Sequence, residues 1–298
     1  MTMIPAFALP LLLGASQGMG DEAEDRRPPG GRFTLWQLPN QTPTQIMSYV
    51  IRTSGGAVIA IDGGMPGDAA YLRGFIAALG NRADAWIITH AHRDHFGALE
   101  VILPEPRDLR IGPIYSSMPD DAWMEAHGNR EEQRDFRGFV DALDKAHRTV
   151  TELALGQELD FDGTRFEVLG IKNLELTANA VNESSIVLRV SDEAKSVLFT
   201  GDLGVQGGEK VMAGPYADRL HVDYLQMAHH GQNGCDEAFY RYVNPRYCLW
   251  PTPDWLWHND NGGGEGSGPW RTLEVRAWME KLPIRRHYLM FEGLCEIE

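Results

Sequence analysis

Short apolar runs recur along the chain between turn residues, and they fall into two series. Apolar and β-branched runs bounded in this way are typical of β-strands. The first series predicts strands at 33–38, 47–53, 57–62, 86–88 and 111–115. The second series predicts strands at 165–171, 185–190, 196–200, 224–228, 246–250, 287–291 and 294–297.

Other stretches have the spacing of amphipathic helices, namely 68–79, 131–150, 236–243 and 270–282. In the second of these, His147 falls on the apolar face, where we expect it to pack in the core. Strands precede helices in each half of the chain. Two sheets with helices on their outer sides fit this order better than a doubly wound sheet, because hairpin-spaced strands open both halves.

The first 31 residues differ from the rest. Residues 4–15 are apolar, like the central region of a signal peptide, but the residues before them lack Lys and Arg. We therefore expect 1–31 to be a disordered extension or a weak signal peptide, and 32–298 to form the folded domain. A cytoplasmic location is favoured, with a secreted or periplasmic one as the alternative. No apolar run reaches the roughly 20 residues of a membrane span.

Composition and charge limit the classes of partner that the chain could bind. The chain has 27 Lys and Arg against 42 Asp and Glu, a net charge of −15, so the backbone of duplex DNA would be repelled. Bound divalent cations would reverse the sign locally, which leaves small-molecule and nucleotide phosphates open. Three widely spaced cysteines predict neither a disulfide framework nor a cysteine metal site. No sequence feature indicates an oligomeric state.

The densest group of potential metal ligands follows the predicted strand at 86–88. His90, His92, Asp94 and His95 lie within six residues, and imidazoles with a carboxylate suit Zn²⁺ or a similar metal. His90 and His92 alternate and can point the same way from an extended turn. Asp94 and His95 begin the next helix and point to an adjacent position. One metal would not easily take all four side chains, so this spacing predicts two neighbouring metals.

This His-x-His-x-Asp-His sequence after an apolar strand resembles the signature of the metallo-β-lactamase superfamily. The resemblance extends from about residue 33 to 297 and implies a four-layer αββα sandwich with metals at one edge of the sheets. Asp62 in the turn Asp62-Gly63-Gly64 resembles a family residue that orients a ligand histidine.

Two later segments add ligands by the same resemblance. Asp202, in Thr200-Gly201-Asp202, is similar to the carboxylate that bridges both metals. One residue of the pair His229 and His230 should bind the second metal beside Asp94 and His95. We favour His229, since it directly ends its strand. His230 is then a proton donor or phosphate contact, and Asp94 and His230 are our candidate catalytic residues.

One position departs from the pattern. Most dinuclear members supply another histidine before the bridging carboxylate, and this chain has none between His147 and His221. Asn182 occupies that region and would be a weak ligand or a substrate contact. This variant is similar to the metallo-β-lactamase domain of DNA-uptake competence proteins and to its stand-alone relatives. Zn²⁺, as two ions, is expected, with Mn²⁺ as the alternative.

Two metals would make a metal-bound hydroxide available at neutral pH. The resemblance therefore implies a metal-dependent hydrolase, and the competence branch favours a phosphodiester such as a nucleotide or single-stranded nucleic acid. One alternative is another class of hydrolase, such as a lactonase, thioesterase or β-lactamase. The second alternative is a non-catalytic metal-binding module. Candidate residues of the substrate pocket are His127, in a stretch that often forms a lid in the family, and Trp255, Trp257 and His258, whose aromatic rings could stack on a base. The alternative is that the tryptophans pack against the second sheet or a subunit contact and that His127 is a solvated surface residue.

Overall fold

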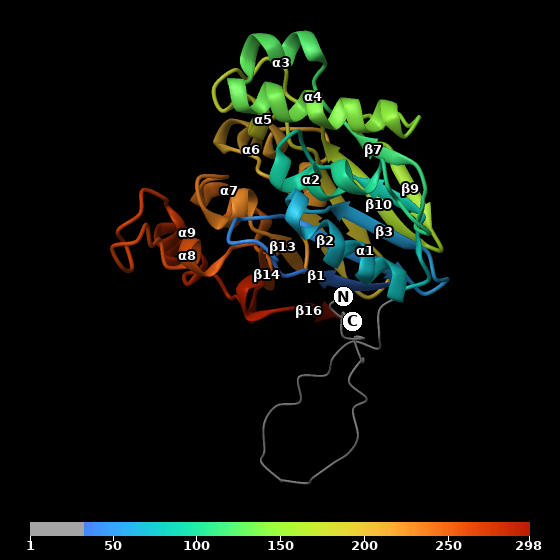
Figure 1. Cartoon of the computed structure of the whole chain (residues 1–298). Helices are drawn as coiled ribbons and strands as arrows, with labels where there is room; N and C mark the ends of the chain where they lie inside the picture. The colour runs from blue at the N-terminus through green and yellow to red at the C-terminus, as the bar shows by residue number, and fades with distance from the viewer. Residues whose placement is uncertain (1–32) are drawn as a thin grey trace.

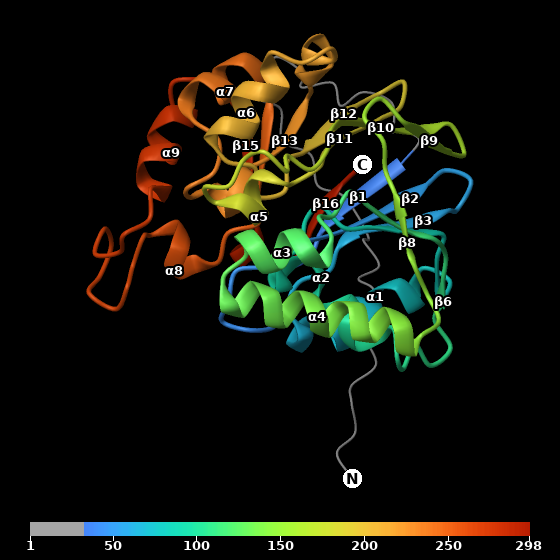
Figure 2. The same cartoon turned by 90° about the horizontal axis from the view of Figure 1, so that it is seen from above.

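The computed structural model describes residues 33–298, so the predicted extension at 1–31 lies outside the described residues. Within that range the chain forms four layers: helices, a sheet, a second sheet, and helices again (Figure 2). This arrangement confirms the predicted αββα sandwich. Among these residues no helix is long and apolar enough to cross a membrane.

The first sheet of the described chain has seven strands in the order β16-β1-β2-β3-β5-β7-β8. The first three along the chain are antiparallel, and β3, β5, β7 and β8 are parallel. Its strands are β1 (Phe33–Gln37), β2 (Ser48–Thr53), β3 (Val58–Asp62), β5 (Ala85–Ile87), β7 (Ile114–Ser116), β8 (Val150–Glu152) and β16 (Cys295–Ile297). A small ribbon joins β4 (Arg82–Ala83) to β6 (Arg110–Ile111).

The second sheet, also seven-stranded over residues 33–298, has the order β15-β14-β13-β12-β11-β10-β9. Antiparallel strands open it, and β12 to β15 run parallel. Its strands are β9 (Glu158–Phe161), β10 (Thr164–Gly170), β11 (Val187–Ser191), β12 (Ser196–Phe199), β13 (Tyr224–Gln226), β14 (Tyr247–Trp250) and β15 (Arg286–Leu289).

Helices cover the outer face of each sheet (Figures 1 and 2). The first sheet carries α1 (Ala69–Ala78), α2 (Arg93–Ile102) and α4 (Arg130–Lys145), with α3 (Asp121–His127) beside α4. The second carries α6 (Val205–Met212), α7 (Glu237–Val243) and α9 (Thr272–Met279). Short helices are α5 (Ala180–Glu183) and α8 (Asp254–Trp257), and 3₁₀ turns are η1 (Pro66–Asp68), η2 (Ala217–Leu220), η3 (Ala228–Gly231) and η4 (Met290–Glu292).

Strand alternation explains the layers. In β3, Val58 and Ala60 point into the apolar cluster under α1, α2 and α4, whereas Ile59 and Ile61 point into the cluster between the sheets. All four are buried, as expected when successive side chains face opposite sides of a sheet that is covered on both.

The prediction of one helix over 131–150 is wrong at its end. Helix α4 stops at Lys145, and His147 is exposed with a φ of 51°, so it is not a core residue. The His147 amide donates to the Asp144 carbonyl at 3.0 Å and the Arg148 amide to the Leu143 carbonyl at 2.9 Å. These two bonds form a Schellman ending, which frees Val150 to begin β8 beside β7.

Candidate metal centre

The loops after β3 and β5 meet because those strands are parallel and end at the same sheet edge. Asp62 closes β3 with a φ of 57° and is fully buried. Its carboxylate accepts hydrogen bonds from the Thr89 amide at 2.7 Å and the Thr89 hydroxyl at 2.8 Å, and its Oδ2 lies 2.7 Å from His95 Nδ1. With Nδ1 held in this way, His95 turns Nε2 toward the second sheet.

Asp202 comes from that second sheet, just after β12. Gly201 before it has a φ of 54°, and a Cβ there would lie 2.8 Å from Ser185 Oγ. The same hydroxyl oxygen accepts the Asp202 amide at 3.0 Å. Glycine is therefore required at 201 for the chain to turn close to Ser185 and direct the buried Asp202 carboxylate into the centre.

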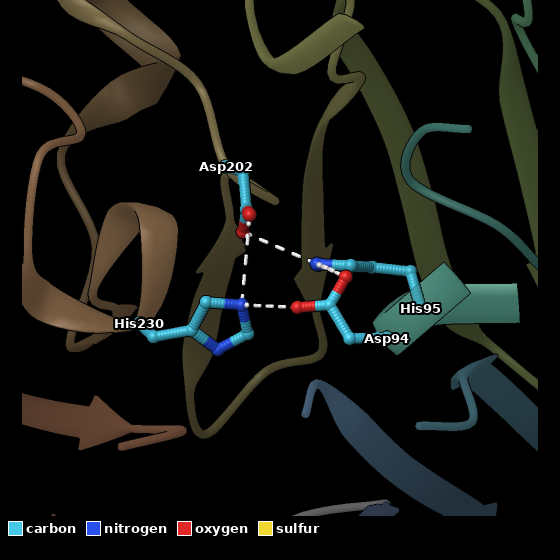
Figure 3. Close-up of side chains that lie close together, drawn as sticks. All are labelled: Asp94, His95, Asp202 and His230. Atoms are coloured by element: carbon cyan, nitrogen blue, oxygen red, sulfur yellow. Dashed lines mark ion pairs between the residues drawn. The ribbon is translucent and has the colours of Figure 1, made fainter. Parts of the chain in front are cut away.

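Four side chains from three segments converge in the first candidate site (Figure 3). Asp202 Oδ1 lies 3.2 Å from His95 Nε2, and Asp94 Oδ2 lies 3.2 Å from His230 Nε2. Asp202 Oδ2 lies 3.5 Å from the same His230 nitrogen. Ligand atoms about 2.0–2.2 Å from one tetrahedral Zn²⁺ are roughly 3.3–3.6 Å apart, so these separations fit a shared cation.

A second group lies against the first. His90, His92 and Asp202 also bring one ligand atom each into close proximity. His90 Nε2 is 3.0 Å from His92 Nδ1 and 3.8 Å from Asp202 Oδ2. Asp202 therefore belongs to both groups, as expected for a carboxylate between two neighbouring cations.

The unpaired atoms of the centre support the fit of a cation. Among the described residues, His95 Nε2, Asp202 Oδ1 and His230 Nε2 are buried and have no hydrogen-bond partner. Buried polar atoms normally have one, since leaving them unpaired costs about 1–3 kcal/mol each. Two ring nitrogens and a carboxylate oxygen are the donors that Zn²⁺ and related metals take.

The charged side chains of the four-residue group shift one another's pKa. Burial opposes protonation of His230, but Asp202 and Asp94 outweigh it and raise the pKa of His230 to about 10. Burial also disfavours the charge of Asp202, yet His230 and His95 hold the pKa of Asp202 well below its usual range. For Asp94, likewise, His95 and His230 overcome burial and lower the pKa. Both carboxylates are thus kept ionised, whereas a bound cation would have to displace the proton of His230, because metal binding requires a neutral imidazole.

The two residues of the pair His229 and His230 lie differently relative to the candidate ligands. Both residues have left-handed backbone angles, with φ of 51° and 55°. This conformation turns the His230 ring inward, where Nδ1 lies 2.9 Å from the Pro251 carbonyl and Nε2 faces Asp94. His229 Nε2 lies 3.6 Å from Asp202 Oδ2, and the His229 side chain is 16% exposed. His230, and not His229, is therefore in the four-residue group.

Asn182 lies in α5 and is buried. Its amide nitrogen donates to Asn179 Oδ1 at 2.9 Å, while its own Oδ1 is buried and unpaired within the described chain. The side-chain hydrogen bond of Asn182 in that part of the chain goes to Asn179 and not to a histidine, so its role as ligand or substrate contact stays a prediction.

Two residues near the centre were not predicted from the sequence. Glu132 Oε1 lies 3.0 Å from His92 Nε2, and Gln45 Nε2 donates to Asp94 Oδ2 at 3.1 Å. The sequence Asn129-x-x-Glu132 indicates a helix start through its capping-box pattern. No local pattern indicates that the same glutamate reaches a histidine 40 residues away.

Within the described residues, the hydrogen bonds and ion pairs of the four predicted pocket residues do not reach the candidate ligands, and their pocket role stays a prediction. His127 is exposed at the end of α3, with its ring 5.0 Å from Trp123. Trp257 packs on Trp250 at 5.0 Å, and His258 pairs with Asp254 and Glu265 at 3.6 Å each. The Trp255 indole donates to the Pro43 carbonyl at 3.0 Å.

This chain is similar in sequence or in fold to several known proteins. ComE operon protein 3 of Bacillus subtilis (strain 168) is 27% identical over 177 residues, which cover 59% of this chain and 21% of that protein. The chain thus spans about a fifth of that relative's length. The metallo-beta-lactamase fold protein YhfI from Bacillus subtilis has a TM-score of 0.53 at 13% identity, over 89% of this chain and 100% of that one.

A diphosphatase of the PhnP family superposes with a TM-score of 0.51 at 15% identity, covering 90% of this chain and 98% of that one. At such identities these likenesses show the fold. The family model described as the metallo-beta-lactamase superfamily matches residues 41–231, a range that holds every candidate ligand. The chain therefore belongs to the metallo-β-lactamase superfamily, whose members are generally hydrolases.

Proposed function

We propose that the chain is a dinuclear metal-dependent hydrolase that cleaves phosphodiesters. One observation carries the proposal: two groups of potential ligands share the buried carboxylate of Asp202. His90 and His92 belong to one group, and Asp94, His95 and His230 to the other. We assign two Zn²⁺ to these groups, with Mn²⁺ as the alternative.

Two divalent cations bound there would lower the pKa of a water molecule from 15.7 toward about 7 and polarise the ester. The chain's own residues would orient this chemistry. Asp62 and the Pro251 carbonyl hold the Nδ1 atoms of His95 and His230, so that both Nε2 atoms face Asp202. Fixed rings of this kind reduce the reorganisation needed during the reaction.

Within the histidine pair, the contacts of the two rings support the opposite assignment to the one favoured from the sequence. We assign His230 to the second metal together with Asp94, because its Nε2 lies 3.2 Å from Asp94 Oδ2. His229 then takes the place of a substrate contact, since its side chain is partly exposed and lies beside Asp202. Asn182 contributes an unpaired amide oxygen, available to a substrate hydroxyl or to a weak metal contact.

The phosphodiester preference rests on likeness to one branch of the family. The segments around Asn182, Asp202 and His229 resemble the competence-protein domain, and ComE operon protein 3 is 27% identical over the aligned residues. The acidity of the chain favours a nucleotide or a short single strand over duplex DNA.

Metal content and substrate choice test the proposal together. The full chain is stripped of metal, reloaded with Zn²⁺ or Mn²⁺, and assayed on bis-(p-nitrophenyl) phosphate, nitrocefin and a lactone panel. We expect about two metals per chain and metal-dependent phosphodiester cleavage, both reduced in Asp202→Asn. Turnover of lactones or lactams alone would refute the phosphodiester assignment. Bound metal without hydrolysis of any ester would instead favour a binding module.

A further inference from the structure

The Glu132 carboxylate has a fixed partner on each oxygen. Oε1 lies 3.0 Å from His92 Nε2, and Oε2 accepts the Asn129 amide at 2.6 Å. Asn129 Oδ1 in turn accepts the amides of Glu131 and Glu132, which completes a capping box at the start of α4. The position of His92 is therefore tied to the first turn of a helix.

Helix α4 also contacts the residues directly before and directly after His92. Ala91, directly before the histidine, shares a buried cluster with Phe136 of α4. Arg93, directly after it, lies 3.8 Å from Asp135 of the same helix. These contacts leave Glu132 little freedom to move relative to the His92 ring.

His92 is also held in the opposite sense to the other histidines of the two groups. His90, His95 and His230 direct Nε2 inward. Their Nδ1 atoms contact the Thr89 hydroxyl, the Asp62 carboxylate and the Pro251 carbonyl. In His92 the outer atom is Nε2, on Glu132, and Nδ1 faces His90 Nε2 at 3.0 Å.

We propose that Glu132 is a positioning residue for His92. It accepts the Nε2–H of the ring and so keeps the lone pair of Nδ1 directed at the cation position shared with His90 and Asp202. This inference rests on the proposed function for the identity of that ligand. Removing such an outer carboxylate typically weakens metal binding by about 10–100-fold, and here the loss should fall on one of the two metals.

Three variants of the full chain separate this role from a structural one. Glu132→Ala removes both contacts of the carboxylate. Glu132→Gln retains an oxygen acceptor and a residue that suits a capping box. Asn129→Ala removes the side-chain cap and leaves Glu132 in place, which makes it the matched control.

Competitive titration with a chromophoric chelator gives the two Zn²⁺ affinities of each protein. We expect Glu132→Ala to weaken one affinity about 10–100-fold and Glu132→Gln to weaken it less. Asn129→Ala should lower the melting temperature and leave both affinities within about twofold of the wild type. Equal losses in Asn129→Ala and Glu132→Ala, or none in Glu132→Ala, would overturn the proposal.

Imidazole ¹⁵N spectra of the metal-free proteins give an independent readout, with His92→Gln used to assign the signal. We expect His92 to carry its proton on Nε2 in the wild type and to become a mixture of tautomers in Glu132→Ala. An unchanged tautomer would overturn the positioning role. A wild-type chain that binds no metal would refute the proposed function, and the spectra would still decide the role of Glu132.

Discussion

Asp62 and His95 are 33 positions apart, and the Asp62 Oδ2 atom lies 2.7 Å from the His95 Nδ1 atom. Both side chains are fully buried. The contact occupies one nitrogen of the ring and leaves the other 3.2 Å from Asp202 on the opposite sheet. A carboxylate at the end of β3 thus sets the direction in which a histidine of α2 faces across the interface between the sheets.

Replacing Asp62 should therefore affect both folding and metal binding. Asp62→Ala leaves the Thr89 amide, the Thr89 hydroxyl and His95 without their buried acceptor, so we expect a loss of about 3–5 kcal/mol in the free energy of unfolding. Zn²⁺ affinity should fall about 10–100-fold. Urea denaturation and metal titration measure the two effects.

Asp68→Ala is the matched control for Asp62→Ala. Asp68 is another buried carboxylate, and it accepts the amides of Gln41 and Met65. Its removal should lower stability and leave metal affinity unchanged. An Asp62 variant with normal Zn²⁺ affinity would show that His95 does not depend on this contact.

The two adjacent histidines should give different metal contents. His230→Ala removes a nitrogen that lies 3.2 Å from Asp94, so we expect about one metal per chain instead of two. His229→Ala should retain both metals and reduce turnover of the phosphodiester. Elemental analysis after gel filtration measures the metal content. Loss of metal in His229→Ala alone would return the ligand role to His229.

Metal should stabilise the wild type much more than Asp202→Asn. A ligand that binds only the folded state adds about 4 kcal/mol when its free concentration is a thousand times its dissociation constant. Because Asp202 belongs to both ligand groups, its replacement should remove most of this gain. Thermal unfolding with excess chelator or with Zn²⁺ measures the difference. Equal shifts in both proteins would place the stabilising ions elsewhere.

The free energy of unfolding should depend on pH through Asp68, which is not one of the candidate metal ligands. Burial raises the pKa of Asp68, although the amides of Gln41 and Met65 act in the opposite direction. Folded Asp68 therefore holds its proton more tightly than the unfolded chain does. Its contribution to stability is greatest below the ordinary Asp pKa of about 3.9 and is lost as pH rises through the raised value.

Asp68→Asn lacks this titration and serves as the reference. The free energy of unfolding of the wild type minus that of the variant should be larger at pH 4 than at pH 7. Urea denaturation of chelator-treated proteins at both pH values tests this. A difference that grows toward pH 7 would mean that the hydrogen bonds outweigh burial at Asp68.

Helix α6 was not predicted from the sequence, and its glycines give the reason. Gly207 and Gly208 lie in its centre, and glycine disfavours helix by about 1 kcal/mol relative to alanine. A Cβ at Gly207 would lie 2.3 Å from Leu203, and one at Gly208 would lie 3.1 Å from Cys235. Close packing therefore leaves no room for a side chain at Gly207 and little at Gly208, a constraint that appears only in three dimensions.

The order of strands and helices along the sequence was enough to predict two sheets with helices outside them, and the spacing from His90 to His95 was enough to predict a cluster of potential ligands, because both patterns are local properties of the chain. Only the tertiary structure shows that the His230 ring is buried while His229 is partly exposed, and that Glu132 of α4 reaches His92. These outcomes depend on the left-handed backbone angles of His229 and His230 and on the packing of α4 against the loop that holds Ala91 and His92. The direction of a side chain follows from backbone angles and from neighbours distant in sequence, and neither leaves a periodic pattern in the chain.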